Sequence, residues 1–191
     1  GLSTTQIAAI ETADLAALST AAIAAFNSSQ ISGLTTAQIE ALTTRQAAAL
    51  TPAEIPGLTT TQIAALETAD LAAIKTNAIS ALSAAQIDAL STTQIAALTP
   101  SQVLALPAAG LSTDQIANLS TADIAKLSTS TIAGFSTDQI HALSTAQIAA
   151  FTTAGITAFT STQIGALSAP QLAALTTTQA AKLGSSQLAG L

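Results

Sequence analysis

The amino-acid sequence predicts an all-α fold, a solenoid of very short capped helices built from about 23 octapeptide repeats. Three observations lead to this prediction. An eight-residue period runs through almost the whole chain, each period carries the residues that begin a helix, and most of the prolines lie where a first helical turn tolerates them.

The repeat has the form L-[S/T]-T-x-Q-I-A-A when octads are counted from Leu2. Thirteen octads span residues 2–105, a five-residue remnant follows at 106–110, and ten octads occupy 111–190. Leu, Ile or Phe fills position 1 in all 23 octads, and Ile, Leu or Val fills position 6 in 21. We therefore predict a single repeat domain over residues 1–191 with an irregular junction at 106–110.

The spacing of the large apolar residues excludes two simpler architectures. Positions 1 and 6 are separated alternately by five and three residues, whereas one face of a β-strand needs an even spacing. A continuous α-helix turns about 100° per residue, so each octad would advance by about 80° and spread Leu and Ile around the circumference. Neither architecture gives one buried face.

Each octad carries a complete set of signals for a helix N-terminus. Ser or Thr at position 2, present in 18 octads, is a preferred N-cap, and Gln at position 5 is the N3 partner of a capping box. Leu at position 1 and Ile at position 6 are then the residues that a hydrophobic staple joins. The next cap follows at once, so we expect helices of roughly six residues, about 9 Å long. Such helices are stable only when stacked, and Ala at positions 7 and 8 would let them approach closely.

The prolines give an independent check of this register. Pro52 and Pro100 lie at position 3, which becomes N1, and Pro170 lies one residue later, still in the first turn. Pro56 and Pro107 do not fit this rule, so we expect a local bend or an altered turn at each.

A longer period lies above the octad. Residues 2–18 and 58–74 are identical at 14 of 17 positions, an offset of seven octads. Duplication of a seven-octad block explains this identity, and the alternative that seven octads complete a superhelical unit is left open. The number of octads in one turn of the solenoid does not follow from the pattern.

Composition narrows the classes of partner. The chain has four Lys and Arg residues and a net charge of −6, which disfavours nucleic-acid binding because that requires several cations to displace counterions. Ser, Thr and Gln interrupt every apolar run well before about 18 residues, so we expect no membrane span. Without an initiating Met or a signal peptide, we interpret the sequence as an internal segment of a longer protein.

The residues that could carry chemistry are few. His141 is the only histidine, and no second ligand or nucleophile accompanies it in the pattern. Glu11 with Asp14, and Glu67 with Asp70, occupy N-cap and N3 sites, where negative charge favours the helix dipole. We therefore expect no enzyme activity, no catalytic or metal-binding residues and no cofactor.

Threonine recurs at position 3 although position 2 already supplies the cap. A regular array of hydroxyls could bind ice, a glycan or a peptide, and this is the alternative to a purely structural role. Self-association is left open.

Two resemblances bear on function. Residues 98–106, L-T-P-S-Q-V-L-A-L, resemble the opening of the transcription activator-like effector repeat, but this chain lacks the longer period of that family and is acidic, so we set it aside. The tandem L-[S/T]-T-x-Q-I-x-A-L tracts resemble the repeat regions of large bacterial surface or secreted proteins that are called adhesin-like. This resemblance implies an extracellular or cell-surface spacer, stalk or scaffold, and it implies no site residues.

Overall fold

In the computed structural model, the described residues 1–107 and 110–191 contain twenty-two α-helices, one 3-10 helix and no strand. This confirms the predicted all-α solenoid of short helices. Contacts divide the chain into two compact units, residues 1–106 and 107–191. The boundary falls at the predicted junction, of which residues 108–109 lie outside the described part. At Pro107, where a bend or an altered turn was expected, the carbonyl accepts a hydrogen bond from the Gly110 backbone N–H at 3.0 Å. The single domain over residues 1–191 stays a prediction.

The helices are as follows. Unit 1 contains α1 (Thr4–Ala8), α2 (Thr12–Ala17), α3 (Thr20–Ile23), α4 (Ser28–Ser32), α5 (Thr36–Glu40), α6 (Thr44–Ala47), η1 (Ile55–Gly57), α7 (Thr60–Ala65), α8 (Thr68–Ala73), α9 (Thr76–Ile79), α10 (Ala84–Asp88), α11 (Thr92–Ala97) and α12 (Pro100–Ala105). Unit 2 contains α13 (Thr113–Ala117), α14 (Thr121–Ile124), α15 (Thr129–Ala133), α16 (Thr137–Ala142), α17 (Thr145–Ala150), α18 (Thr153–Thr157), α19 (Ser161–Gly165), α20 (Ala169–Ala173), α21 (Thr177–Ala180) and α22 (Ser185–Leu188).

Helix α11 shows how one octad folds. The Gln94 backbone N–H donates to Ser91 Oγ at 3.1 Å, and the Ser91 backbone N–H donates to Gln94 Oε1 at 2.8 Å. These two bonds form the predicted capping box. The helix ends at Leu98, whose backbone is extended and whose N–H donates to the Ile95 carbonyl. The α-helices have four to six residues, at or slightly below the expected length.

The core consists of positions 1 and 6. Position 6 is the most deeply buried, with Ile95 and Ile140 at 1 % and 0 % exposure, and position 1 covers it, as Leu90 does at 3 %. The large apolar residues that remain exposed are Leu2, Leu104, Leu188 and Leu191. Among the described residues, no helix has the length and apolar character needed to cross a bilayer.

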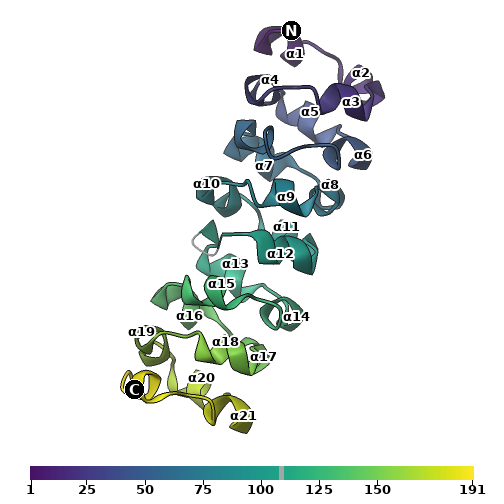
Figure 1. The fold of residues 1–191 in the computed structure, drawn as a ribbon. Helices are drawn as coiled ribbons and strands as arrows, with labels where there is room; N and C mark the ends of the chain where they lie inside the picture. Colours follow the sequence, from purple (N-terminus) through teal and green to yellow (C-terminus); the bar gives the residue numbers. More distant parts are fainter. Residues whose placement is uncertain (108–109) are drawn as a thin grey trace. The chain divides into compact units, whose positions relative to one another are not determined.

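Within each unit, helices stack on the helix of the third octad further along the chain. In unit 1, α1 packs on α4, α2 on α5 and α3 on α6; in unit 2, α13 packs on α16 and α14 on α17. The successive turns can be followed in Figure 1. One turn of the solenoid therefore takes three helices, or three octads. The side-chain bonds between turns join residues 28 and 31 apart, because a glutamine near the N-terminus of one helix reaches the C-terminal end of another helix.

Close approach of stacked turns explains the small residues at position 8. A Cβ atom at Gly57 would lie 2.2 Å from the Ser28 carbonyl oxygen, and one at Gly33 would lie 2.9 Å from Thr4 Cα. Among the described residues no glycine has a positive φ, so these glycines are required by space and not by backbone conformation. Ala or Gly fills position 8 in 20 octads, so the side chain there rarely exceeds one methyl group.

Two of the three prolines that were expected in a first helical turn lie there. Pro100 is the N1 residue of α12 and Pro170 lies in the first turn of α20, as predicted. The expectation that Pro52 begins an α-helix was wrong, because residues 52–54 form a turn that continues into the 3-10 helix η1. The reason lies at Pro56, which has no N–H to donate to the Pro52 carbonyl, so the α-helical ladder cannot extend. The altered turn expected at Pro56 is confirmed.

Replacing Gly57 with Ala should destabilise unit 1 by roughly 1–3 kcal/mol, because the added methyl group meets the Ser28 backbone and forces two turns apart. Urea denaturation followed by circular dichroism measures this change. The control is Gly184→Ser. Gly184 is the N-cap of α22 without a side-chain acceptor, and the nearest atom to an added Cβ is 3.9 Å away. Serine there should stabilise by about 0.5 kcal/mol. Equal effects at both sites would contradict the steric explanation.

Candidate functional site

The glutamine at position 5 joins successive turns of the solenoid. Besides completing the capping box of its own helix, Gln94 donates from Nε2 to the Ile63 carbonyl at 3.1 Å and to the Leu66 carbonyl at 2.8 Å. Its side chain is 4 % exposed. The two acceptors belong to the C-terminal end of α7, one turn earlier in the chain. We call this pair of bonds from one Nε2 atom the glutamine bridge.

The bridge recurs with constant spacing. The acceptors precede the glutamine by 31 and 28 residues, at positions 6 and 1 of earlier octads. Both bonds occur at Gln38, Gln46, Gln62, Gln86, Gln94, Gln102, Gln147, Gln163, Gln171, Gln179 and Gln187. One amide thus caps the N-terminus of its own helix and the C-terminal carbonyls of another helix.

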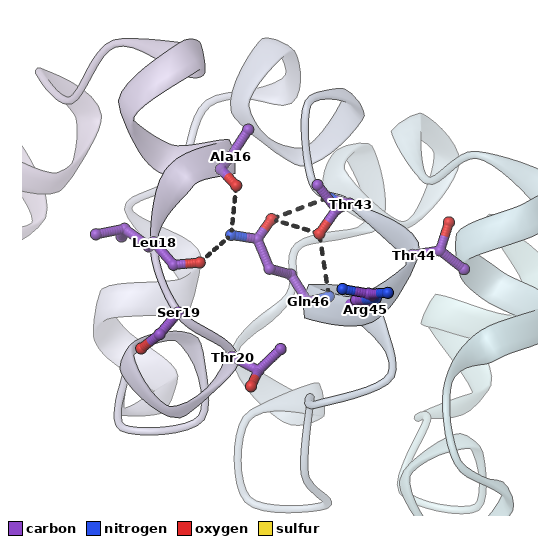
Figure 2. Close-up of a pocket in the computed structure, with 8 residues that line it drawn as sticks. All are labelled: Ala16, Leu18, Ser19, Thr20, Thr43, Thr44, Arg45 and Gln46. Atoms are coloured by element: carbon purple, nitrogen blue, oxygen red, sulfur yellow. Dashed lines mark hydrogen bonds between the residues drawn. The ribbon is translucent and has the colours of Figure 1, made fainter.

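Figure 2 shows this arrangement at Gln46, beside a groove in unit 1. Gln46 Oε1 accepts from the Thr43 backbone N–H at 2.9 Å, and Nε2 points to the opposite side, toward the Ala16 and Leu18 carbonyls at 3.3 and 2.9 Å. The Leu15 carbonyl accepts a further bond at 2.8 Å. The carbonyl oxygen and the amino group of the side chain therefore have different, non-exchangeable roles.

Sequence reasoning identified position 5 as a cap and missed its second role. A glutamate caps an N-terminus as well as glutamine does and also suits the positive end of the helix dipole. It has no hydrogen to donate to the carbonyls behind it. All 15 glutamines of the chain lie at position 5, where glutamate occurs only once, at Glu54. This preference for the amide over the carboxylate was the available signal.

Two octads of unit 1 carry a carboxylate in the slot of the bridging glutamine. Glu54 Oε2 accepts from the Thr51 backbone N–H, whereas Glu54 Oε1 is buried and has no partner. Asp70 is 2 % exposed, and its Oδ2 atom is also buried without a partner. These are the unpaired buried side-chain polar atoms of the described residues. Both residues occupy position 5 of their octads, where glutamine would supply a donor.

The equivalent pairs Glu11–Asp14 and Glu67–Asp70 do occupy N-cap and N3 sites, on α2 and α8, but neither glutamate side chain caps its helix. Asp14 is exposed, because no turn precedes it, whereas Asp70 is covered. Burial raises the pKa of the Asp70 carboxyl, a side-chain hydrogen bond from Thr44 partly opposes this shift, and the Glu67 carboxylate adds to it. The pairs are therefore equivalent in sequence but not in environment.

The other candidate residues are dispersed. His141 is exposed at the end of α16, and only its backbone carbonyl takes part in the bridge of Gln171. Within residues 1–107 and 110–191, no three acidic, His or Cys side chains lie close enough together to hold a metal ion.

The surface grooves lie between turns. The groove of Figure 2 has a volume of about 760 Å³ and is lined by hydroxyl groups and Arg45. Two of these hydroxyls are already N-caps, since Ser19 Oγ accepts from Ala22 N–H and Thr43 Oγ1 accepts from Gln46 N–H. A second groove, of about 480 Å³, includes the carboxylates of Glu40 and Glu67. Both grooves are open and their linings differ in charge.

Replacing Gln94 with Glu should destabilise unit 1 by roughly 2–5 kcal/mol. Glutamate keeps the acceptor for Ser91 but leaves the Ile63 and Leu66 carbonyls facing a buried negative charge. Gln6→Glu is the matched control, because exposed Gln6 forms the same capping box at the first turn. It should change the free energy of unfolding by no more than about 0.5 kcal/mol. Similar losses in urea denaturation at both sites would show that capping, and not bridging, matters.

The raised pKa of Asp70 predicts a pH dependence with a definite sign. The folded state holds the Asp70 proton more tightly than the unfolded state does. The contribution of this proton to the free energy of unfolding is therefore fully present below the unfolded pKa and is lost as pH rises through the folded pKa. Asp70→Asn removes this titration. Its free energy of unfolding relative to wild type should therefore increase between pH 4 and pH 7, as measured by denaturation across that range. Asp14→Asn measures the same chemical change without burial, and an equal pH trend there would contradict the assignment.

Comparison with known protein families finds one match. The family described as the ALTTAQ repeat matches residues 7–44, 31–60, 63–100, 116–153, 137–169 and 148–177. The letters of that description correspond to positions 8, 1, 2, 3, 4 and 5 of the octad, as in residues 41–46, and end on the bridging glutamine. The chain matches none of the curated proteins and none of the solved structures with which it was compared. These matches cover most of both units, and the chain belongs to the ALTTAQ repeat family.

Proposed function

We propose that this chain is a non-enzymatic spacer, stalk or scaffold module of a large bacterial surface or secreted protein. The observation that carries the proposal is the glutamine bridge. Each bridge joins an octad only to octads one turn earlier, so the same local contact serves wherever a glutamine at position 5 follows an earlier turn. A module of this kind lengthens by addition of octads without a new core.

Two features of the sequence support this role, a duplicated block and the scarcity of basic residues. The identity of residues 2–18 with residues 58–74 fits growth by block duplication. The only Lys and Arg residues are Arg45, Lys75, Lys126 and Lys182, so proteases that require a basic side chain find few sites, which suits an extracellular location. The same scarcity of cations argues against a nucleic-acid partner.

Insertion of extra octads tests the spacer role directly. Residues 82–105 form three complete octads with a glutamine in each, and a tandem copy inserted before Leu82 preserves the octad phase. Since the chain contains no cysteine, Thr36→Cys and Thr93→Cys allow a fluorescence energy transfer measurement between two exposed sites in unit 1. One inserted copy should lengthen the separation by roughly 8–10 Å, and two copies by twice that amount.

The uninserted, doubly labelled chain is the reference, and denaturation should show that each insertion keeps the unit folded. A separation that stays constant as octads are added would overturn the spacer role, since the inserted turns would then not extend the stack.

The groove of Figure 2 favours a second candidate, a binding module for a glycan. The exposed residues Ser19, Thr20 and Thr44 line this groove together with Arg45, and hydroxyl and guanidinium groups suit hydroxylated or anionic sugars. A glycan array probed with the whole chain tests this candidate. Binding that is lost in Arg45→Ala, with folding intact, would support the binding module, and an array without signal would reject it.

A further inference from the structure

The bridges are not evenly distributed along unit 1. Where residues 28–49 stack on the first turn, Gln30, Gln38 and Gln46 all donate across the interface. Where residues 82–105 stack on the preceding turn, Gln86, Gln94 and Gln102 do so. The interface between these two contains fewer glutamine bridges.

In that middle interface, η1, α7 and α8 stack on α4, α5 and α6. Position 5 of the octads at 50–81 is occupied by Glu54, Gln62, Asp70 and Ala78. Only Gln62 forms a bridge, to the Ile31 and Leu34 carbonyls. We call this interface the seam.

Two features make the seam weaker than its neighbours. It lacks the donors for three pairs of carbonyls, which by the constant spacing include those of Ile39 and Leu42 opposite Asp70. It also holds both of the unpaired buried atoms, Glu54 Oε1 and Asp70 Oδ2. A buried carboxylate oxygen without a hydrogen-bond partner costs free energy, whereas a bridging amide at the same position of the octad contributes to stability.

One pair of facing positions in the seam carries two small residues. Position 6 carries Ala47, where every other octad of unit 1 carries Ile, Leu or Val, and Ala78, which replaces glutamine, lies opposite it in the register of 31 residues. Both side chains are fully buried, so the two small residues reduce the buried apolar area on both sides of the interface.

We propose that the seam is the point at which unit 1 opens, so that residues 1–50 separate from residues 54–106, which remain folded. This inference is independent of the proposed function. Residues 1–50 hold one bridged interface of their own, but a segment of this size buries little surface and its short helices are unstable without further stacking. Opening of the seam therefore leads to unfolding of residues 1–50 and leaves the bridged remainder intact.

Trypsin cleavage after two basic residues measures opening on the two sides of the seam. Arg45 is exposed on α6, in the part that separates, and Lys75 is exposed at the N-cap of α9, which packs on α12 in the part that remains. Trypsin cuts a folded chain only after local or global opening, so the two cleavage rates measure two opening equilibria. Cleavage after Arg45 should be at least tenfold faster than after Lys75, with a smaller dependence on urea.

Restoration of the bridges gives the decisive comparison. Asp70→Gln combined with Ala78→Gln supplies donors to the seam and should slow cleavage after Arg45 at least tenfold. The rate of cleavage after Lys75 should change little, because the opening that exposes Lys75 does not pass through the seam. Asp14→Gln is the matched control, since the sequence around Asp14 is nearly identical and no turn precedes it. It should leave both rates within twofold of wild type.

Removal of the one bridge in the seam, that of Gln62, gives a second and independent test. Gln62→Ala should accelerate cleavage after Arg45 at least tenfold while cleavage after Lys75 changes less. Equal rates and equal urea dependences at Arg45 and Lys75 in the wild type would overturn the proposal, because unit 1 would then open as a whole. Rates after Arg45 that respond neither to the double replacement nor to Gln62→Ala would also overturn it, because opening would then be fraying from the N-terminus.

Discussion

The structure depends on a single amide that must satisfy two helices at once. A helix of four to six residues has nearly all of its backbone groups at its termini, where no intrahelical partner is available. At the N-terminus it needs an acceptor, and at the C-terminus it needs a donor. The glutamine side chain offers both on one rigid plane, and its length allows Oε1 to reach its own N-cap while Nε2 reaches the carbonyls of the preceding turn. Shorter or ionised side chains supply only one of the two functions.

This polar contact also determines what the apolar core has to do. The bridge aligns successive turns at a constant offset, so a thin layer of Leu and Ile from positions 1 and 6 is buried in the stack, joined in unit 2 by Phe135, Phe151 and Phe159 at position 1. Small residues at position 8 are the steric counterpart, because the same offset brings backbones together at Gly33 and Gly57. Polar bridge, aliphatic layer and small residues are thus three consequences of one stacking geometry.

Much of the fold could be predicted from the sequence, because its determinants are local. N-caps, capping boxes and the apolar positions repeat within eight residues, and the structure places them as expected, as it does Pro100 and Pro170. The bridge could not be predicted in the same way. A repeat pattern shows which residues are equivalent from octad to octad, but it does not show which octads contact one another. The offset of 28 and 31 residues arises from the path of the solenoid, and no single octad encodes it.

The same limit explains the individual differences. Asp14 and Asp70 have nearly identical neighbours in the sequence, yet only Asp70 has a turn stacked before it and becomes buried. Pro52 satisfied the rule for an N1 proline, but Pro56 removed the N–H that an α-helix needs four residues later. In both cases a second residue or a second turn, and not the local motif, decided the outcome. The candidate site followed the same logic, because the amide preference at position 5 became meaningful only once the turns were stacked.

The most direct test of this account is the hydrogen exchange of the glutamine side-chain amides, measured by NMR on a chain labelled with ¹⁵N at glutamine. If the bridges hold the turns together, the Nε2 protons of buried residues such as Gln94 and Gln171 should exchange only when the structure opens, orders of magnitude more slowly than those of exposed Gln6. Exchange of the Gln94 and Gln171 side chains at the rate of Gln6 would contradict the account, because the turns would then be held by apolar packing alone.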